Sequence, residues 1–181
     1  MSELILKNAR IPRSLSPFPQ GDSILVDCDV RIANGLITSV DQAGAGTLGD
    51  TAEVQDLQGR IVMPGFLDAH VHLDKAFTWD RAPNVRGEFW DAIQLLTKDK
   101  DNWTAEDLYR RGSFALRCAE AHGSVALRTH VDTGLDWGEV SHDAMQTLRD
   151  EWAGRIDLQT VSLCALESYM EPADDVSLSG L

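Results

Sequence analysis

The second half of the chain alternates between segments with the pattern of buried strands and segments with the pattern of amphipathic helices. Strands are predicted over residues 61–74, 124–132 and 156–163, and helices over residues 105–122 and 140–153. Strands separated by helices in this way pair in parallel, so the order of elements requires a parallel sheet. TIM barrels and doubly wound sheets both contain such a sheet, and the pattern alone leaves both architectures open.

Local signals define these elements more closely. Thr104 and Asp107 have the spacing of a capping box at the start of the first helix, and Gly123 is typical of a helix end. Residues 61–67 are mostly apolar, which predicts that the first strand is buried on both faces. The second helix carries three large apolar side chains on one face, namely Met145, Leu148 and Trp152.

Residues 1–60 contain short apolar segments separated by turn residues. Asn34-Gly35 lies between two alternating apolar segments, which predicts a β-hairpin because both turn positions need a positive φ. Residues 14–21, with two prolines, are predicted to form a loop, and the glycine-rich residues 43–50 a flexible connection. These strands are too few to close a core alone, so we expect 1–60 to be part of a region distinct from 61–181.

The composition is that of a globular protein with an acidic excess. The 29 acidic and 16 basic residues give a formal net charge of −13, which argues against binding to nucleic acids and to anionic membranes. No apolar run approaches the roughly 18 residues of a membrane span, and the first ten residues lack a signal-peptide pattern. The three cysteines are far apart in the sequence, which favours a reducing compartment, so we expect a cytoplasmic protein.

Two histidines, His70 and His72, follow the apolar run of the first predicted strand. Residues i and i+2 of a strand point to the same side, so both imidazoles can reach one metal ion. Active sites of parallel α/β folds lie at this carboxyl end of the strands, and neutral imidazole binds Zn²⁺ or Fe²⁺. Two ligands alone do not define a metal site, and from the spacing alone a chance pair of hydrogen-bonded histidines is the alternative.

The segment around these histidines is the most specific motif of the chain. Residues 64–74, PGFLDAHVHLD, resemble the opening barrel strand of the amidohydrolase superfamily, in which a PGxxDxHxHxD segment carries the first two metal ligands. The resemblance implies a metal-dependent hydrolase TIM barrel, with residues 1–60 forming part of an N-terminal β-sandwich. The chain is most similar to cytosine deaminases and isoxanthopterin-type deaminases, through residues 72–75, 114–119, 128–132 and 156–159.

The resemblance assigns His70 and His72 as ligands of a divalent metal ion, zinc or iron. His130 and Asp132 end the next predicted strand, and Lys75 begins the loop after the first one, so we expect these three residues to line the substrate site. Structural alternatives stay open for them. His130 could be a hydrogen-bonded residue of the barrel interior, and Lys75 could belong to an exposed charge pair of the loop.

A complete barrel is longer than this chain, since a TIM barrel typically takes about 250 residues. The resemblance implies further metal ligands and proton-transfer residues on later strands, beyond residue 181, so no catalytic residue is named here. We expect residues 61–181 to supply about three of the eight barrel strands. The sequence is then a truncated form, or it is completed by a second chain or by homo-oligomerisation, and we expect no activity from it alone.

The resemblance implies a deaminase of aminated heterocycles of the cytosine or pterin type, which uses a metal-activated water. Two alternatives remain, a cyclic-amide hydrolase with the same metal ligands and an inactive truncated product. The formal charge after residue 60 is −10, from 11 basic and 21 acidic residues, which disfavours anionic substrates. We therefore expect a small, neutral heterocyclic substrate.

Overall fold

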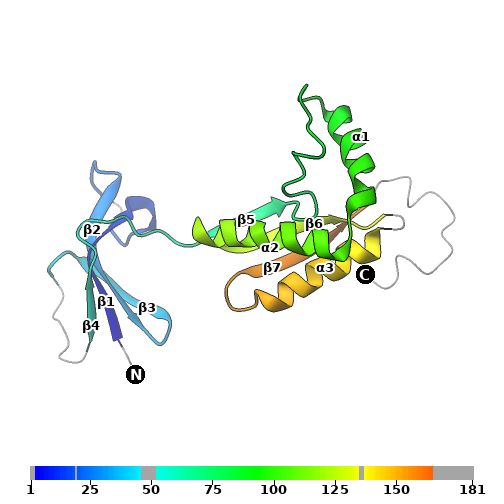
Figure 1. Cartoon of the computed structure of the whole chain (residues 1–181). Helices are drawn as coiled ribbons and strands as arrows, with labels where there is room; N and C mark the ends of the chain where they lie inside the picture. Colours follow the sequence, from blue (N-terminus) through cyan, green and yellow to red (C-terminus); the bar gives the residue numbers. More distant parts are fainter. Residues whose placement is uncertain (1–2, 19, 46–51, 135–136, 165–181) are drawn as a thin grey trace. The chain divides into compact units, whose positions relative to one another are not determined.

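The computed structural model describes residues 3–18, 20–45, 52–134 and 137–164 (Figure 1). The chain divides after Pro64 into two compact units, Met1–Pro64 and Gly65–Leu181. Each unit contains its own sheet and its own apolar cluster, and each is described separately below.

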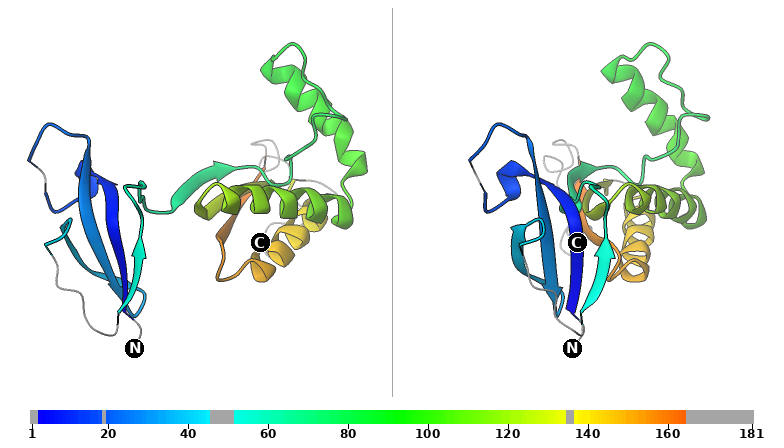
Figure 2. Two further views of the ribbon diagram at one scale, coloured as in Figure 1. Left: turned by 60° about the vertical axis from the view of Figure 1, so that its left-hand side comes forward. Right: turned by 90° about the vertical axis from the view of Figure 1, so that its left-hand side faces the viewer.

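The first unit is a four-stranded sheet in the order β3-β2-β1-β4 (Figure 2). Antiparallel pairing joins β1 to β2 and β2 to β3, whereas β1 and β4 run parallel. A small buried cluster formed by Ala9, Ile11, Cys28 and Val30 lies on one face of this sheet. The elements are β1 (Glu3–Pro12), the 3-10 helix η1 (Arg13–Leu15), β2 (Leu25–Ala33), β3 (Leu36–Gln42) and β4 (Glu53–Asp56).

The predicted hairpin is confirmed, because β2 and β3 are joined by Asn34 and Gly35 with φ angles of 55° and 75°. The described part of residues 14–21 is a loop, as predicted, except that the 3-10 helix η1 includes its first two residues. Residue 19 lies outside the described residues. Most of the connection predicted over residues 43–50 also lies outside them. Strand β4 was not predicted, since all four of its residues are exposed and carry no apolar alternation.

The second unit contains a three-stranded parallel sheet in the order β5-β6-β7. This confirms the predicted alternation of strands and helices. Right-handed crossovers in one direction place α2 and α3 on the same side of the sheet, where they contact each other (Figures 1 and 2). The elements are β5 (Phe66–Val71), α1 (Phe89–Asp99), η2 (Lys100–Asn102), α2 (Ala105–Ala121), β6 (Ser124–Asp132), α3 (Gly138–Glu151) and β7 (Asp157–Leu163).

The ends of helix α2 form as the sequence predicts. Thr104 accepts a hydrogen bond at its Oγ1 from the backbone N–H of Asp107, at 3.2 Å, so the Thr104 side chain caps the helix. Gly123 follows the helix with a φ of 86°, a conformation that glycine adopts without steric cost. No helix among the described residues is both long enough and apolar enough to span a bilayer.

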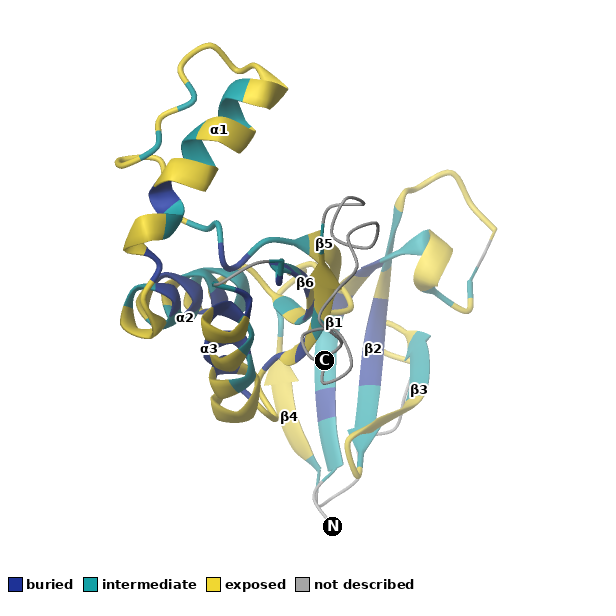
Figure 3. Cartoon of the chain, turned by 90° about the vertical axis from the view of Figure 1, so that its right-hand side faces the viewer, coloured by how far each residue is buried: buried dark blue, intermediate teal, exposed yellow. Residues whose placement is uncertain are grey.

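The apolar core of this unit lies between the sheet and the two helices. Leu127 and Val131 of β6 and Leu158 of β7 are buried in it, together with Met145 and Leu148 of α3. Figure 3 shows buried segments along α2 and α3. The opposite face of the sheet carries polar residues, including His70, His72, Arg128, His130, Asp132 and Gln159.

Strand β5 corrects the prediction of burial on both faces. The strand begins only at Phe66, Leu67 is 75% exposed, and Ile61 instead forms a bridge with Arg10 in the first unit. Within its own unit β5 pairs with β6 alone, and the helices pack on β6 and β7. The apolar sequence of this segment therefore does not bury it among the described residues.

Candidate metal centre

Four predicted site residues meet at the carboxyl end of the parallel strands. His70 lies on β5 and His72 directly after it, whereas His130 and Asp132 lie at the end of β6. Because Val71 is paired in register with Thr129, these residues come together although they are about sixty positions apart. The rings of His70 and His130 stack with centroids 4.0 Å apart, and those of His72 and His130 are 5.9 Å apart.

The two histidines of the motif turn the same ring nitrogen toward each other. Nε2 of His70 lies 3.3 Å from Nε2 of His72. Two imidazole nitrogens bound tetrahedrally to one zinc ion, each about 2.05 Å from it, are also about 3.3 Å apart. The observed separation fits a hydrogen bond between the two nitrogens, and it also fits the coordination of one metal ion by both. The distance between the two Nε2 atoms is therefore compatible with two ligands of one metal.

Hydrogen bonds on the far side of the rings hold this arrangement. Nδ1 of His72 lies 2.9 Å from the carbonyl oxygen of His130, and since a carbonyl only accepts, Nδ1 carries the proton. Nε2 of His72 is then the nitrogen with a free lone pair, as a metal ligand requires. On β5 the carboxylate of Asp68 accepts the backbone N–H of His70 at 3.2 Å, so Asp68 supports the strand locally.

His130 supports the pair and has an unusual environment of its own. Its Nδ1 is buried and has no hydrogen-bond partner among the described residues. Desolvation, followed by the neighbouring His70 and His72, lowers the pKa of His130 below its ordinary value. The lowered pKa favours the neutral form of the His130 ring beside the two histidines of the motif.

Asp132, at the carboxyl end of β6, forms ion pairs with two lysines. Its Oδ1 is 2.7 Å from Nζ of Lys75, and its Oδ2 is 2.9 Å from Nζ of Lys100. Burial alone would raise the pKa of Asp132, but the ammonium groups of Lys100 and Lys75 outweigh it and hold the pKa below the usual range. The charge pair of Lys75 is therefore a half-buried one with Asp132, not an exposed pair within its own loop.

The neighbouring Asp74 is fully buried and has a structural contact. Its Oδ2 accepts the backbone N–H of Asp132 at 3.0 Å, which joins the loop after β5 to the end of β6. Burial raises the pKa of Asp74 above its ordinary value, and the hydrogen bond from Asp132 works in the opposite direction.

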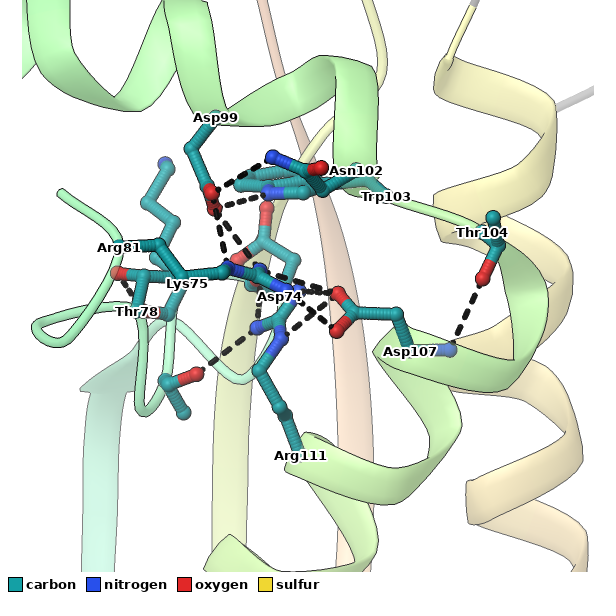
Figure 4. Close-up of polar contacts among 11 residues, drawn as sticks. Asp74, Lys75, Thr78, Arg81, Asp99, Asn102, Trp103, Thr104, Asp107 and Arg111 are labelled. Atoms are coloured by element: carbon teal, nitrogen blue, oxygen red, sulfur yellow. Dashed lines mark hydrogen bonds and ion pairs between the residues drawn. The ribbon is translucent and has the colours of Figure 1, made fainter.

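Arg111 of α2 fixes the loop that carries Lys75 (Figure 4). Its Nη1 donates to the carbonyl oxygens of Asp74 and Ala76, at 2.7 and 2.8 Å. Its Nε donates to Asp107, one turn earlier on the same helix, at 2.9 Å. One guanidinium thus positions the residues on both sides of Lys75 from the covered side of the sheet.

A second arginine extends this network to the segment before α2. Arg81 donates to Asp107 at 2.7 Å and to Asp99 at 2.9 Å (Figure 4). Asp99 is 4% exposed and also accepts from Nε1 of Trp103 at 3.0 Å. These bonds fix the end of α1, and with it the position from which Lys100 reaches Asp132.

Sequence reasoning missed Lys100 as a residue of the site. Its partner Asp132 is 32 positions away in the sequence. No motif joins the two residues. Among the described residues, no group of three or more His, Cys, Asp or Glu side chains converges as a metal site does, so this part of the chain offers the His70–His72 pair alone.

Several known proteins are similar to this chain in sequence. The model of the amidohydrolase family matches residues 53–106, which include both histidines of the motif. The chain is 33% identical over 178 residues to a pterin deaminase of Rhizobium rhizogenes, covering 95% of this chain and 40% of that protein. It is 30% identical over 169 residues to an N-isopropylammelide isopropyl amidohydrolase of a Pseudomonas species, covering 88% of this chain and 38% of that protein.

A solved structure gives the same result for the fold. The 5-methylcytosine deaminase of Klebsiella pneumoniae superimposes with a TM-score of 0.68 at 28% identity, covering 88% of this chain and 36% of that one. The second unit thus has the fold of part of a metal-dependent hydrolase barrel. More particularly, the chain corresponds to the N-terminal part of amidohydrolase-superfamily proteins of the pterin and cytosine deaminase type. It spans about two fifths of the length of the curated relatives that it matches.

Proposed function

We propose that this chain supplies the first metal-binding strand and part of the substrate-binding rim of a metal-dependent deaminase of aminated heterocycles. His70 and His72 would hold the ion, and further ligands would come from outside the described residues. The observation that carries the proposal is the 3.3 Å separation of their Nε2 atoms at the carboxyl end of β5. Members of the superfamily are metal-dependent, and an imidazole pair suits zinc or iron.

Such an ion would supply a water of lowered pKa as the nucleophile. The other described residues of the site would orient the two histidines. The carbonyl of His130 keeps the proton of His72 on Nδ1, and the stacked ring of His130 restricts the rotation of His70. The reaction replaces the amino group of the ring by an oxygen atom from water and releases ammonia.

The substrate class rests on the relatives. The names of the pterin deaminase and of the 5-methylcytosine deaminase refer to aminated heterocycles, and we extend this class to the present chain. The acidic balance after residue 60 supports a neutral ring over an anionic one. We also propose a cytoplasmic location and no nucleic-acid or membrane partner, on the basis of charge and cysteine usage.

A second candidate has support from one comparison. The relative from Pseudomonas is named an N-isopropylammelide isopropyl amidohydrolase, so the relatives are not all named as deaminases. A cyclic-amide hydrolase would use the same two histidines and would open a ring instead of releasing ammonia.

A hybrid enzyme separates these functions. This chain would replace the corresponding N-terminal part of the pterin deaminase of Rhizobium rhizogenes, and ammonia release would be measured with pterin and cytosine beside ring opening of hydantoin and dihydroorotate. We expect ammonia release that the His72→Ala change reduces at least about a hundredfold, since the ion loses a ligand. Preferential ring opening would favour the cyclic-amide hydrolase, and activity retained in His72→Ala would contradict the metal assignment.

A further inference from the structure

Helix α1 presents an apolar face that the described residues of this chain do not cover. Phe89 and Ile93 are one turn apart on this face and Trp90 lies beside them, and the three side chains are 68%, 44% and 72% exposed. The helix projects away from α2, α3 and the sheet of its own unit (Figures 1 and 3). Asp99, in the last turn, is the one buried residue of α1.

The opposite side of α1, which is mainly polar, is the side that the chain itself contacts. Residues 83–86 and four residues of this side line a cavity of about 320 Å³, the four being Asp91, Gln94, Leu95 and Lys98. Nε of Arg86 donates to Oδ2 of Asp91 at 2.6 Å, which joins this loop to the first turn of the helix. An amphipathic helix is ordinarily stabilised by burial of its apolar side, so the contacts within the chain leave that stabilisation unused.

A helix of this length needs such burial. Helix α1 has 11 residues, and helices shorter than about 12–15 residues are marginal in water unless an apolar face packs against another element. The base of α1 is fixed, because the carboxylate of Asp99 accepts from Arg81 at 2.9 Å and from Nε1 of Trp103 at 3.0 Å. A helix that is fixed at its base and uncovered along its apolar face is a surface suited to a partner.

The charges along α1 favour a second copy of the same helix as that partner. Glu88 precedes the helix and Asp91 lies in its first turn, whereas Lys98 lies in its last turn. Two such helices that pack in opposite directions bring each acidic end beside a basic end, and their dipoles are then also antiparallel. Residues 82–98 carry two acidic and two basic side chains, so two copies of a chain with net charge −13 can approach here with little repulsion.

The exposed area indicates a weak and reversible association. Large aromatic side chains bury about 150–250 Å² each, so Phe89, Trp90 and Ile93 offer roughly 350 Å² per copy at their observed exposures. Stable specific complexes bury about 800 Å² per partner. These three side chains supply less than half of that area, and we therefore expect micromolar rather than nanomolar affinity.

We propose that the chain forms a two-fold symmetric dimer in which the apolar faces of two α1 helices pack against each other in antiparallel orientation. In a two-fold interface the same surface of each copy contacts its counterpart. Ile93, near the middle of the helix, would therefore lie close to Ile93 of the second copy. This inference is independent of the proposed metal-dependent function.

Sedimentation velocity between about 1 and 200 μM tests the dimer, since this range brackets a micromolar dissociation constant. The unaltered chain would be compared with Ile93→Lys and Phe89→Gln on the apolar face. Val85→Lys is the matched control, because Val85 is also apolar, is 83% exposed and lies in the loop on the other side of α1. Circular dichroism and thermal unfolding would establish that each variant is folded, and either variant of the apolar face suffices.

We expect the unaltered chain and Val85→Lys to change from monomer to dimer with the same dissociation constant, of order 10 μM. Ile93→Lys should raise that constant at least about tenfold, because it brings two ammonium groups together at the two-fold axis, and Phe89→Gln about fivefold. A chain that stays monomeric over the whole range would overturn the proposal. Association that persists unchanged in Ile93→Lys and Phe89→Gln would also overturn it, since another surface, such as the exposed β5, would then be responsible.

Discussion

The two faces of the β5-β6-β7 sheet have opposite compositions. The face beneath α2 and α3 buries Leu127, Val131 and Leu158, whereas the other face carries His70 and His130 and is partly exposed. Because side chains alternate along a strand, neighbouring residues of β6 serve the two faces in turn. The difference indicates that one face of this sheet mainly stabilises the fold, whereas the other carries the candidate metal ligands. Substitutions of apolar residues on the covered face should change stability, and substitutions of the exposed histidines on the open face should change metal binding. Asp132 also lies on the open face, but it is ion-paired there and should affect stability through those pairs.

The largest effect on stability should follow from Leu148→Ala on the covered face. Leu148 is fully buried, and α2 approaches it so closely that a Cβ on Gly112 would lie 2.5 Å from its Cδ1. Loss of its side chain should cost about 3 kcal/mol in the free energy of unfolding, measured by urea denaturation. Leu67→Ala on exposed β5 is the control, with a change within about 0.5 kcal/mol. Equal costs for the two variants would contradict the comparison of the faces.

Arg111→Lys tests whether a residue on the covered side of the sheet also positions the loop that carries Lys75. Lysine keeps the charge but cannot bind the carbonyls of Asp74 and Ala76 together with Asp107. We expect a loss of about 2 kcal/mol in stability and faster amide hydrogen exchange over residues 74–78. The neighbouring exposed Arg110→Lys should show neither effect. Unchanged exchange in Arg111→Lys would show that the loop holds its position without this arginine.

The ion pairs of Asp132 predict a dependence of stability on pH. The pKa of Asp132 is lowered in the folded state, so its contribution is present above its unfolded value of about 4 and is lost as pH falls through the lower folded value. Asp132→Asn should therefore destabilise the chain by about 2 kcal/mol at pH 7, and the difference should shrink below about pH 4. The exposed Asp143→Asn serves as the control. A difference that stays constant down to pH 2 would exclude these ion pairs as its cause.

His70→Ala should have the smallest effect on stability, within about 0.5 kcal/mol, because the residue is exposed on the open face. Urea denaturation without metal measures it. A loss of several kcal/mol would mean that His70 is a structural residue, and the division of roles between the two faces would then fail at its central position.

Much of this arrangement could be predicted from sequence, because its signals are local. The Asn34-Gly35 turn, the Thr104 cap and the histidine spacing each depend on residues a few positions apart, and the structure has the expected turn, helix and ring convergence. The Lys100–Asp132 pair depends on tertiary packing across 32 positions and leaves no such signal. Helix α1 was also missed, although its residues 89–99 have an amphipathic pattern that could have predicted a helix.

Strand β5 shows a different limit. Its apolar sequence predicted burial, yet Phe66 and Leu67 are 51% and 75% exposed. A hydrophobic pattern reports what a segment can bury, whereas burial itself depends on the elements that are present to cover it. The local sequence pattern therefore predicted the strand that carries His70, but it did not predict how far that strand is covered by other elements.

Zinc titration of the metal-free chain tests the central claim most directly. The unaltered chain should bind one zinc ion weakly, so that little remains after dialysis, because two imidazoles make only part of a catalytic site. Binding should fall at least about tenfold in His70→Ala and in His72→Ala. It should stay unchanged in His122→Ala, whose ring is exposed at the end of α2. A tightly held ion that survives replacement of both His70 and His72 would contradict the assignment of these residues as metal ligands.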